Sequence, residues 1–273
     1  MNSTMTRSTT QSRDGTTVAF EATGEGPSIV FVPAAFQHLA IDATGARVAE
    51  LLAPRFTVYR YDRRGRGGSG DTAPYAVERE IEDLAAALDA AGGSGCAFGG
   101  SSGAVLALEA AARGVEIARL ALYEPPFVVD PGRGALPKDY LRRLDELIAA
   151  GRQGDAVEYF LTAAIGMPPA AVSAMGDMPL WPALTSVAHT LAYDSRVMGD
   201  TMGGDPSALE RFADVAVPTL VIDGGDSPPS MEMAADALAG VLPNVERRTL
   251  AGQTHEVAPE ALAPALEDFF TRP

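Results

Sequence analysis

The chain has almost no cysteine and almost no lysine, and each scarcity excludes a kind of chemistry. Cys96 is the only cysteine, so no disulfide can form within the chain, and no Cys/His cluster has the spacing of zinc ligands. Lys138 is the only lysine and lies in no motif that would form a Schiff base or hold a phosphate. The sequence therefore predicts no disulfide framework, no metal site and no lysine-based catalysis.

Long apolar runs and an excess of positive charge are also missing. No stretch has eighteen uninterrupted apolar residues, and the first seventeen residues are polar and lack the apolar core of a signal peptide. The chain carries 21 basic and 36 acidic residues, and the resulting net charge of −15 repels phosphate backbones and anionic lipid headgroups. We therefore expect a cytoplasmic protein that binds neither nucleic acid nor membranes.

The residues that are present predict an α/β protein. A length of 273 residues allows about two units of roughly 150 residues, or one large α/β domain with an insertion. Short apolar and β-branched runs alternate with Ala/Leu/Glu-rich stretches of helical period, which indicates a mostly parallel sheet with helices on both faces. The expected strands cover residues 16–22, 28–33, 56–62, 96–101, 120–125, 218–224 and 245–250, and the expected helices cover residues 39–53, 75–91, 102–113, 229–241 and 257–270.

The alternation stops in the middle of the chain. Between residues 126 and 217 no strand pattern occurs, and helical stretches such as 138–150 and 153–164 are broken by Pro, Gly and Met. We interpret this segment as a helical insertion in the sheet domain.

Two glycine clusters are candidate functional loops. Residues 65–70, GRGGSG, match a dinucleotide-binding G-x-G-x-x-G, but Asp71 to Pro74 delay the helix that this motif requires, so we interpret them as a loop. Residues 99–103, GGSSG, match G-x-S-x-G at the point where a buried strand ends and a helix starts. Such a turn holds Ser101 in a strained conformation that exposes its hydroxyl, as a nucleophile requires; the alternative is a Gly/Ser loop that only caps the helix.

A serine nucleophile needs a base, and the chain offers His38, His189 and His255. His255 lies in GQTHEVAP, after the last expected strand and before the last helix. Its place after Ser101 and after a strand-end acid reproduces the order Ser, acid, His of the α/β-hydrolases. His255 is therefore the candidate base.

Five motifs, in this order, resemble those of the α/β-hydrolase superfamily over residues 15–270. They are VFVPAA for the oxyanion loop, YRYDRRGRGGSGD for the D-x-R-G-x-G-x-S segment, FGGSSGA for the nucleophile elbow, PTLVIDGG for the acid-bearing strand and GQTHEVAP for the histidine loop. The resemblance implies a doubly wound, mostly parallel sheet of about eight strands in residues 1–126 and 217–273, with a helical cap inserted at 127–216. It also implies an oxyanion hole built from the N–H groups of Ala35 and Ser102.

The chain departs from the family pattern in two places. Relatives often have His-Gly where this chain has Pro33-Ala34, and they carry the acid at G-x-x-D after the seventh strand, whereas Asp226 falls one residue short of that spacing from Gly224. Glu124 ends the strand LALYEP, where some members of the superfamily place their acid. Glu124 and Asp226 are thus alternatives for the acid, and Glu124 is slightly favoured because it needs no register shift.

The function implied by this resemblance is hydrolysis of an ester or lactone of a small, apolar molecule through an acyl-enzyme on Ser101. The reaction needs neither a metal nor an organic cofactor. We expect Phe36, Trp181 and His189 to contact the substrate. C–C bond hydrolysis and acyl transfer use the same residues and stay open, as does a ligand-binding or cofactor-free, non-hydrolytic use of the fold.

Overall fold

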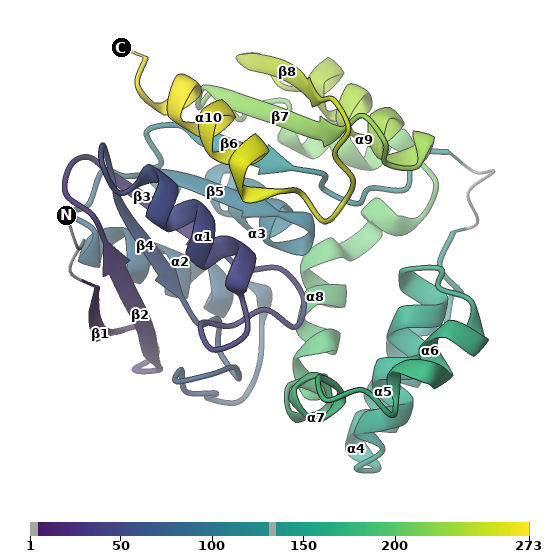
Figure 1. Cartoon of the computed structure of the whole chain (residues 1–273). Helices are drawn as coiled ribbons and strands as arrows, with labels where there is room; N and C mark the ends of the chain where they lie inside the picture. The colour runs from purple at the N-terminus through teal and green to yellow at the C-terminus, as the bar shows by residue number, and fades with distance from the viewer. Residues whose placement is uncertain (1–4, 131–134, 273) are drawn as a thin grey trace.

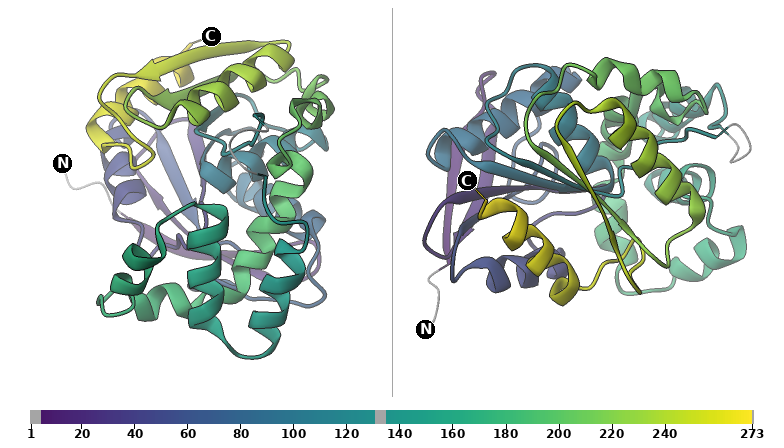
Figure 2. Two further views of the ribbon diagram at one scale, coloured as in Figure 1. Left: turned by 90° about the vertical axis from the view of Figure 1, so that its right-hand side faces the viewer. Right: turned by 90° about the horizontal axis from the view of Figure 1, so that it is seen from above.

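A twisted sheet flanked by helices, with a second group of helices beside it, forms the part of the chain that the computed structural model describes, residues 5–130 and 135–272 (Figures 1 and 2). Residues 1–4 and 273 of the expected sheet domain, and residues 131–134 of the expected insertion, lie outside the described residues. The strands are β1 (Thr6–Gln11), β2 (Thr17–Thr23), β3 (Ser28–Val32), β4 (Thr57–Tyr61), β5 (Cys96–Gly100), β6 (Leu120–Tyr123), β7 (Thr219–Gly224) and β8 (Val245–Leu250).

The eight strands form one sheet in the order β1-β2-β4-β3-β5-β6-β7-β8. β2 runs antiparallel to both of its neighbours, and the strands from β4 to β8 run parallel to one another. The inner strands are apolar on both faces, and every residue of β6 and β7 is buried. Strands of this composition need helices on both faces of a parallel sheet.

Two hydrophobic clusters lie on the two faces of the sheet. Helices α1 (Ala43–Leu52) and α10 (Pro259–Phe270) pack on one face, and α2 (Val77–Ala90), α3 (Ser101–Ala112) and α9 (Pro229–Val241) pack on the other (Figure 1). This doubly wound arrangement confirms the predicted fold class.

A helical insertion connects β6 to β7. Its described helices are α4 (Tyr140–Ala149), α5 (Gln153–Tyr159), a π-helical turn (Phe160–Ala164), α6 (Pro169–Met175), α7 (Trp181–Ser186), α8 (Leu191–Met198) and three 3₁₀ turns (Ala188–Thr190, Gly199–Met202 and Pro206–Phe212). The first part of the insertion has its own hydrophobic cluster, which includes Tyr140, Leu144 and Phe160. From Val197 to Phe212, the buried side chains join the core of the sheet domain instead. Phe127 and Val128 at the start of the insertion belong to the same core, so the insertion is anchored near both of its ends.

The strands predicted from apolar runs are all present, with ends that differ by one or two residues. β1 was not predicted, because its sequence TRSTTQ is polar and five of its six residues are exposed. The strand forms through backbone pairing with β2 at the edge of the sheet, from Thr6 opposite Ala22 to Gln11 opposite Thr17. Backbone pairing needs no apolar alternation, so a polar edge strand leaves no hydrophobic signal.

The turn from β5 into α3 depends on close packing against β3. A Cβ atom on Gly103 would lie 2.2 Å from the carbonyl oxygen of Val32, which is far inside van der Waals contact. A Cβ atom on Gly100 would meet nothing closer than the carbonyl oxygen of Tyr123 at 4.0 Å. Gly103, and not Gly100, is therefore needed to let α3 approach β3.

We therefore predict that Gly103→Ala lowers the free energy of unfolding by about 1–3 kcal/mol, the usual cost of overpacking. Gly100→Ala is the matched control and should unfold at nearly the wild-type urea concentration, because its new methyl group has room. Urea denaturation followed by circular dichroism measures both variants. Equal midpoints for the two would contradict this account of the turn.

Candidate active site

Ser101 begins α3 directly after β5 and has a left-handed backbone. Its φ of +51° is rare for a residue with a side chain and costs energy unless the surrounding structure holds it. The hydroxyl of Ser101 thus lies at the carboxyl edge of the sheet, at the positively polarised end of a twelve-residue helix. This is the geometry that the G-x-S-x-G pattern predicts for a nucleophile elbow.

His255 is hydrogen-bonded to Glu124. The Nδ1 atom of His255 lies 2.7 Å from Oε2 of Glu124, whose side chain is fully buried, while the imidazole is 42% exposed. The other carboxylate oxygen of Glu124 accepts a hydrogen bond of 2.8 Å from the backbone N–H of Gly224. A carboxylate held in this way orients the ring and leaves Nε2 free to exchange a proton with a hydroxyl.

The surroundings of Glu124 keep it ionised. Burial alone would raise the pKa of this carboxyl, but hydrogen bonds from His255 and from the N–H of Gly224 outweigh burial and hold the pKa below its usual value. Ser227 stands three residues after Gly224, where relatives carry their acid, and its buried hydroxyl makes no hydrogen bond of normal geometry. The spacing from Gly224 could have revealed Ser227 from the sequence.

Asp226 has a different place from the one its sequence position suggested. Its side chain is exposed, and its backbone N–H donates a 2.8 Å hydrogen bond to the carbonyl of Gln253 in the histidine loop. The hydroxyl of Tyr123 donates to the carbonyl of Thr254 in the same loop. The structure thus joins His255 to Glu124, while Asp226 and Tyr123 hold the loop that carries the histidine.

The loop after β3 carries Ala35 and Phe36. The N–H of Ala34 donates to Oε1 of Gln37 at 2.8 Å, and Phe36 has a left-handed backbone with φ of +65°. The ring of Phe36 packs edge-on against Phe160 of the insertion, with 5.4 Å between ring centroids. The hydrogen bond between Ala34 and Gln37 closes the loop into a short turn, and Phe36 packs this turn against the insertion.

A buried ionic network lies behind this loop, and the sequence analysis missed it. Asp194 of α8 accepts hydrogen bonds from Arg63 at 2.6 Å and from Arg66, and its Oδ1 also accepts one from the hydroxyl of Ser102 at 2.8 Å. Arg63 is paired on its other side with Glu80, at 2.6 and 2.7 Å. The arginines were visible in the motif DRRGRG, but their partner Asp194 lies more than 120 residues further along the chain.

The structure places His189 and Trp181 in the insertion. The Nε2 atom of His189 lies 3.5 Å from Asp71, which also accepts a 3.0 Å hydrogen bond from Tyr193, so this histidine faces the loop that follows β4. Trp181 packs with the apolar cluster that contains Phe160. Within residues 5–130 and 135–272, neither residue is hydrogen-bonded to Ser101 or His255, so their expected contact with substrate stays a prediction.

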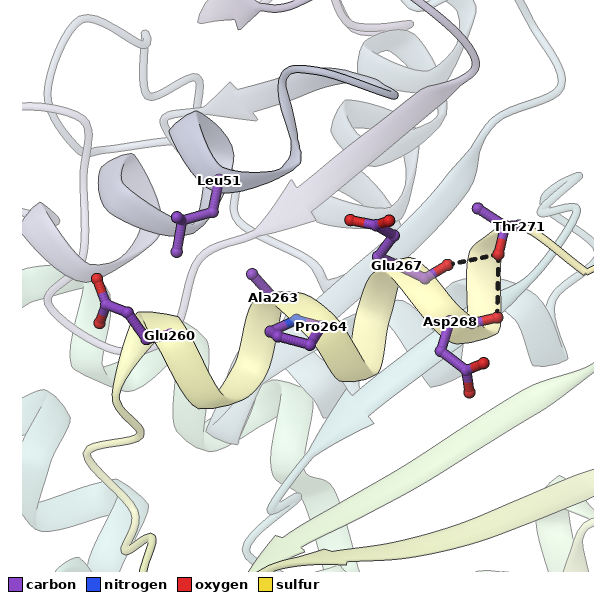
Figure 3. A pocket seen from close by; sticks show the side chains of 7 residues that line it. All are labelled: Leu51, Glu260, Ala263, Pro264, Glu267, Asp268 and Thr271. Carbon is purple, nitrogen blue, oxygen red and sulfur yellow. Dashed lines mark hydrogen bonds between the residues drawn. The ribbon is translucent and has the colours of Figure 1, made fainter.

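A surface cleft of about 490 Å³ lies elsewhere, between α1 and α10 (Figure 3). Its lining residues are Leu51, Glu260, Ala263, Pro264, Glu267, Asp268 and Thr271. The predicted site residues are absent from this lining. Within residues 5–130 and 135–272, no cluster of three His, Cys, Asp or Glu side chains could hold a metal ion. The helices in these two ranges are all too short or too polar to cross a bilayer.

Comparison with known proteins agrees with this geometry. The chain is 55% identical to an alpha/beta hydrolase from Sphaerobacter thermophilus whose crystal structure superimposes with a TM-score of 0.88, covering 97% of this chain and 100% of that one. An enol-lactonase from Burkholderia xenovorans is 20% identical with a TM-score of 0.65, covering 95% of this chain and 98% of that one, and so shares the fold.

A curated relative matches part of the chain. N-formylmaleamate deformylase from Pseudomonas putida is 35% identical over 143 residues, which are 50% of this chain and 52% of that protein. The match thus spans about half the length of the deformylase. A family model described as the alpha/beta hydrolase family matches residues 29–265, most of the sheet domain together with the insertion. The chain therefore belongs to the alpha/beta hydrolase family.

Proposed function

We propose that this chain is a serine hydrolase that cleaves an ester or lactone of a small, apolar substrate through an acyl-enzyme. The observation that carries the proposal is the 2.7 Å hydrogen bond between Nδ1 of His255 and the buried carboxylate of Glu124, which accepts it. A surface histidine has no need of a fully buried carboxylate, whereas a catalytic base needs one to fix its tautomer and to stabilise its charged form. Ser101, at the end of the adjacent strand, is the nucleophile in this proposal.

The reaction follows from these roles. His255 accepts the hydroxyl proton of Ser101 on Nε2 as Oγ attacks the carbonyl carbon, and the N–H groups of Ala35 and Ser102 hydrogen-bond to the oxyanion that forms. Collapse of this tetrahedral intermediate breaks the bond to the leaving alcohol, which takes the proton from His255. Water then attacks the acyl-enzyme, with His255 again as base, and releases the acid. The cycle needs no cofactor.

The proposed substrate class rests on the side chains around the insertion. Phe36 and Phe160 meet at the border between the oxyanion loop and the insertion, and Met167 packs in the same apolar cluster. We propose that the insertion acts as the cap of the site and that these side chains line it, which favours a small, apolar acyl group. Two similar proteins, an enol-lactonase and N-formylmaleamate deformylase, support the proposal that this chain hydrolyses small acyl compounds.

We predict that Ser101→Ala folds normally but loses both ester hydrolysis and labelling by a fluorophosphonate, because the other hydroxyl of the elbow, that of Ser102, is buried and donates to Asp194. Ser173→Ala, on an exposed face of α6, is the matched control and should be labelled like the wild type. Gel fluorescence and hydrolysis of p-nitrophenyl acetate measure the two activities. An unlabelled wild-type protein, or a labelled Ser101→Ala, would refute the proposed nucleophile.

The two candidate acids should respond differently to conversion into amides. Glu124→Gln is expected to lower kcat by roughly 10⁴-fold, the size of this effect in a serine protease, because the histidine loses its orientation and charge partner. Asp226→Asn should keep kcat near the wild-type value, because the side chain of Asp226 is exposed. Steady-state kinetics on p-nitrophenyl acetate compares them. A larger loss in Asp226→Asn would make Asp226 the acid.

Glu124 should also affect stability in acid. Its pKa in the folded protein lies below the usual 4.5, so its contribution to the free energy of unfolding is present above about pH 4.5 and is lost as the pH falls through the folded value. The difference in unfolding free energy between wild type and Glu124→Gln should therefore shrink as the pH drops from 6 to 3.5. Urea titrations at several pH values measure it. A difference that grows in acid would show that Glu124 has a raised pKa.

A further inference from the structure

Asp194 connects the helical insertion to both parts of the proposed oxyanion hole. Its side chain is buried on α8, and its two oxygens accept hydrogen bonds from Arg63, Arg66 and Ser102. No step of the proposed reaction uses Asp194. Burying a carboxylate costs free energy, and a buried charge that loses its partners is strongly destabilising, so the three partners of Asp194 need an explanation.

The contact through Arg66 reaches Ala35. Nη1 of Arg66 donates a 2.6 Å hydrogen bond to the carbonyl oxygen of Ala34. A trans peptide is planar, so its C=O and its N–H point in opposite directions. The carbonyl of Ala34 and the N–H of Ala35 belong to one peptide unit, so the hydrogen bond to Arg66 directs the N–H of Ala35 away from that guanidinium.

Arg63 supports the same loop. Its Nη1 lies 3.3 Å from the carbonyl oxygen of Pro33, so two consecutive carbonyls of the loop face guanidinium groups that Asp194 holds. Thr190, at the start of α8, accepts a further 2.9 Å hydrogen bond from Nε of Arg66. Asp194 and Thr190 thus help to fix the orientation of the loop, together with the hydrogen bonds between Ala34 and Gln37 within it.

Asp194 contacts the second proposed oxyanion donor, Ser102, directly. The hydroxyl of Ser102 donates to Oδ1 of Asp194 at 2.8 Å, and the N–H of the same residue is the other proposed oxyanion donor. We propose that Asp194 is a positioning residue that holds both donors of the oxyanion hole in register, one through Arg66 and the other through Ser102. This inference rests on the proposed function, because it assumes that an oxyanion forms there.

The network is built to keep Asp194 charged. Burial raises the pKa of its carboxyl, but the positive charges of Arg63 and Arg66 and the hydroxyl of Ser102 more than compensate, so the pKa lies below its usual value. An asparagine would keep the shape and one acceptor, but its NH₂ group would face a guanidinium. Asp194→Asn should therefore release Arg66 and let the peptide of Ala34 turn.

The test compares Asp194→Asn with Asp83→Asn. Asp83 is an equally buried carboxylate that pairs with Arg64 of the same loop through two hydrogen bonds of 2.8 Å, and it touches neither Ala34 nor Ser102. Both variants weaken buried ion pairs, two in Asp194→Asn and one in Asp83→Asn, so thermal melting should show destabilisation in both and the larger loss in Asp194→Asn. Only Asp194→Asn should lose transition-state stabilisation.

The readouts separate a positioning role from a structural one. With p-nitrophenyl acetate, Asp194→Asn should lower kcat by roughly 10²-fold with little change in KM, because an oxyanion hole acts in the transition state. Binding of phenylboronic acid, which forms a tetrahedral adduct on the serine, should weaken by a similar factor. Asp83→Asn should keep kcat and the boronate affinity near the wild-type values. Ser102→Ala, which keeps every charge, should lower kcat to a smaller extent.

Each alternative outcome is distinguishable. If Asp194→Asn and Asp83→Asn are both folded and have the same kcat, Asp194 has only a structural role and the inference is wrong. If Asp194→Asn does not fold, Ser102→Ala decides, and an unchanged kcat and boronate affinity in that variant overturn the inference. A wild-type protein that neither hydrolyses the ester nor reacts with a fluorophosphonate would instead refute the proposed function itself.

Discussion

The parallel pairing of β5, β6 and β7 is the constraint on which the rest of the site depends. Gly100 pairs with Tyr123, and Tyr123 pairs with Ile222, so the three strands end at nearly the same level. The residues that follow the first two, Ser101 and Glu124, therefore emerge side by side at one edge of the sheet. The N–H of Gly224 on the third strand reaches Glu124 for the same reason. A shift of one residue in any of these pairings would separate them.

The buried ion pairs of the loop after β4 are a second constraint on the site. Within four residues it carries Arg63, Arg64 and Arg66, each at most 2% exposed. Their carboxylate partners come from α2, from α8 and, for Arg64, also from Asp14 between β1 and β2, so the loop connects the sheet, a flanking helix and the insertion. The planar guanidinium group presents five N–H donors in fixed directions. Arg63 donates four hydrogen bonds, to Glu80, Asp194 and the carbonyl of Pro33, whereas a lysine ammonium has only three N–H donors. This explains why arginine, rather than lysine, stands in the loop.

The sequence was sufficient for those features that leave a local pattern. Apolar runs marked the inner strands, and the glycines around Ser101 marked the elbow. It could not decide between Glu124 and Asp226, because that choice depends on how the loop after β7 turns, and the turn directs the backbone rather than the side chain of Asp226 toward the histidine loop. The role of Asp194 could not be predicted from the sequence. A single acidic residue in a helix is usually exposed to solvent, and its partners Arg63 and Arg66 come close to it only in the fold.

Three residues with side chains have a left-handed backbone among residues 5–130 and 135–272: Phe36, Ser101 and Glu124. Each conformation costs on the order of 1–3 kcal/mol, and all three lie at the proposed site. Glycine would adopt them without strain. A thermostabilising design that ranked positions by backbone strain would therefore replace these three residues first, and would remove the proposed nucleophile, its proposed acid partner and an aromatic side chain of the loop after β3. In this chain the most strained backbone positions coincide with the proposed site.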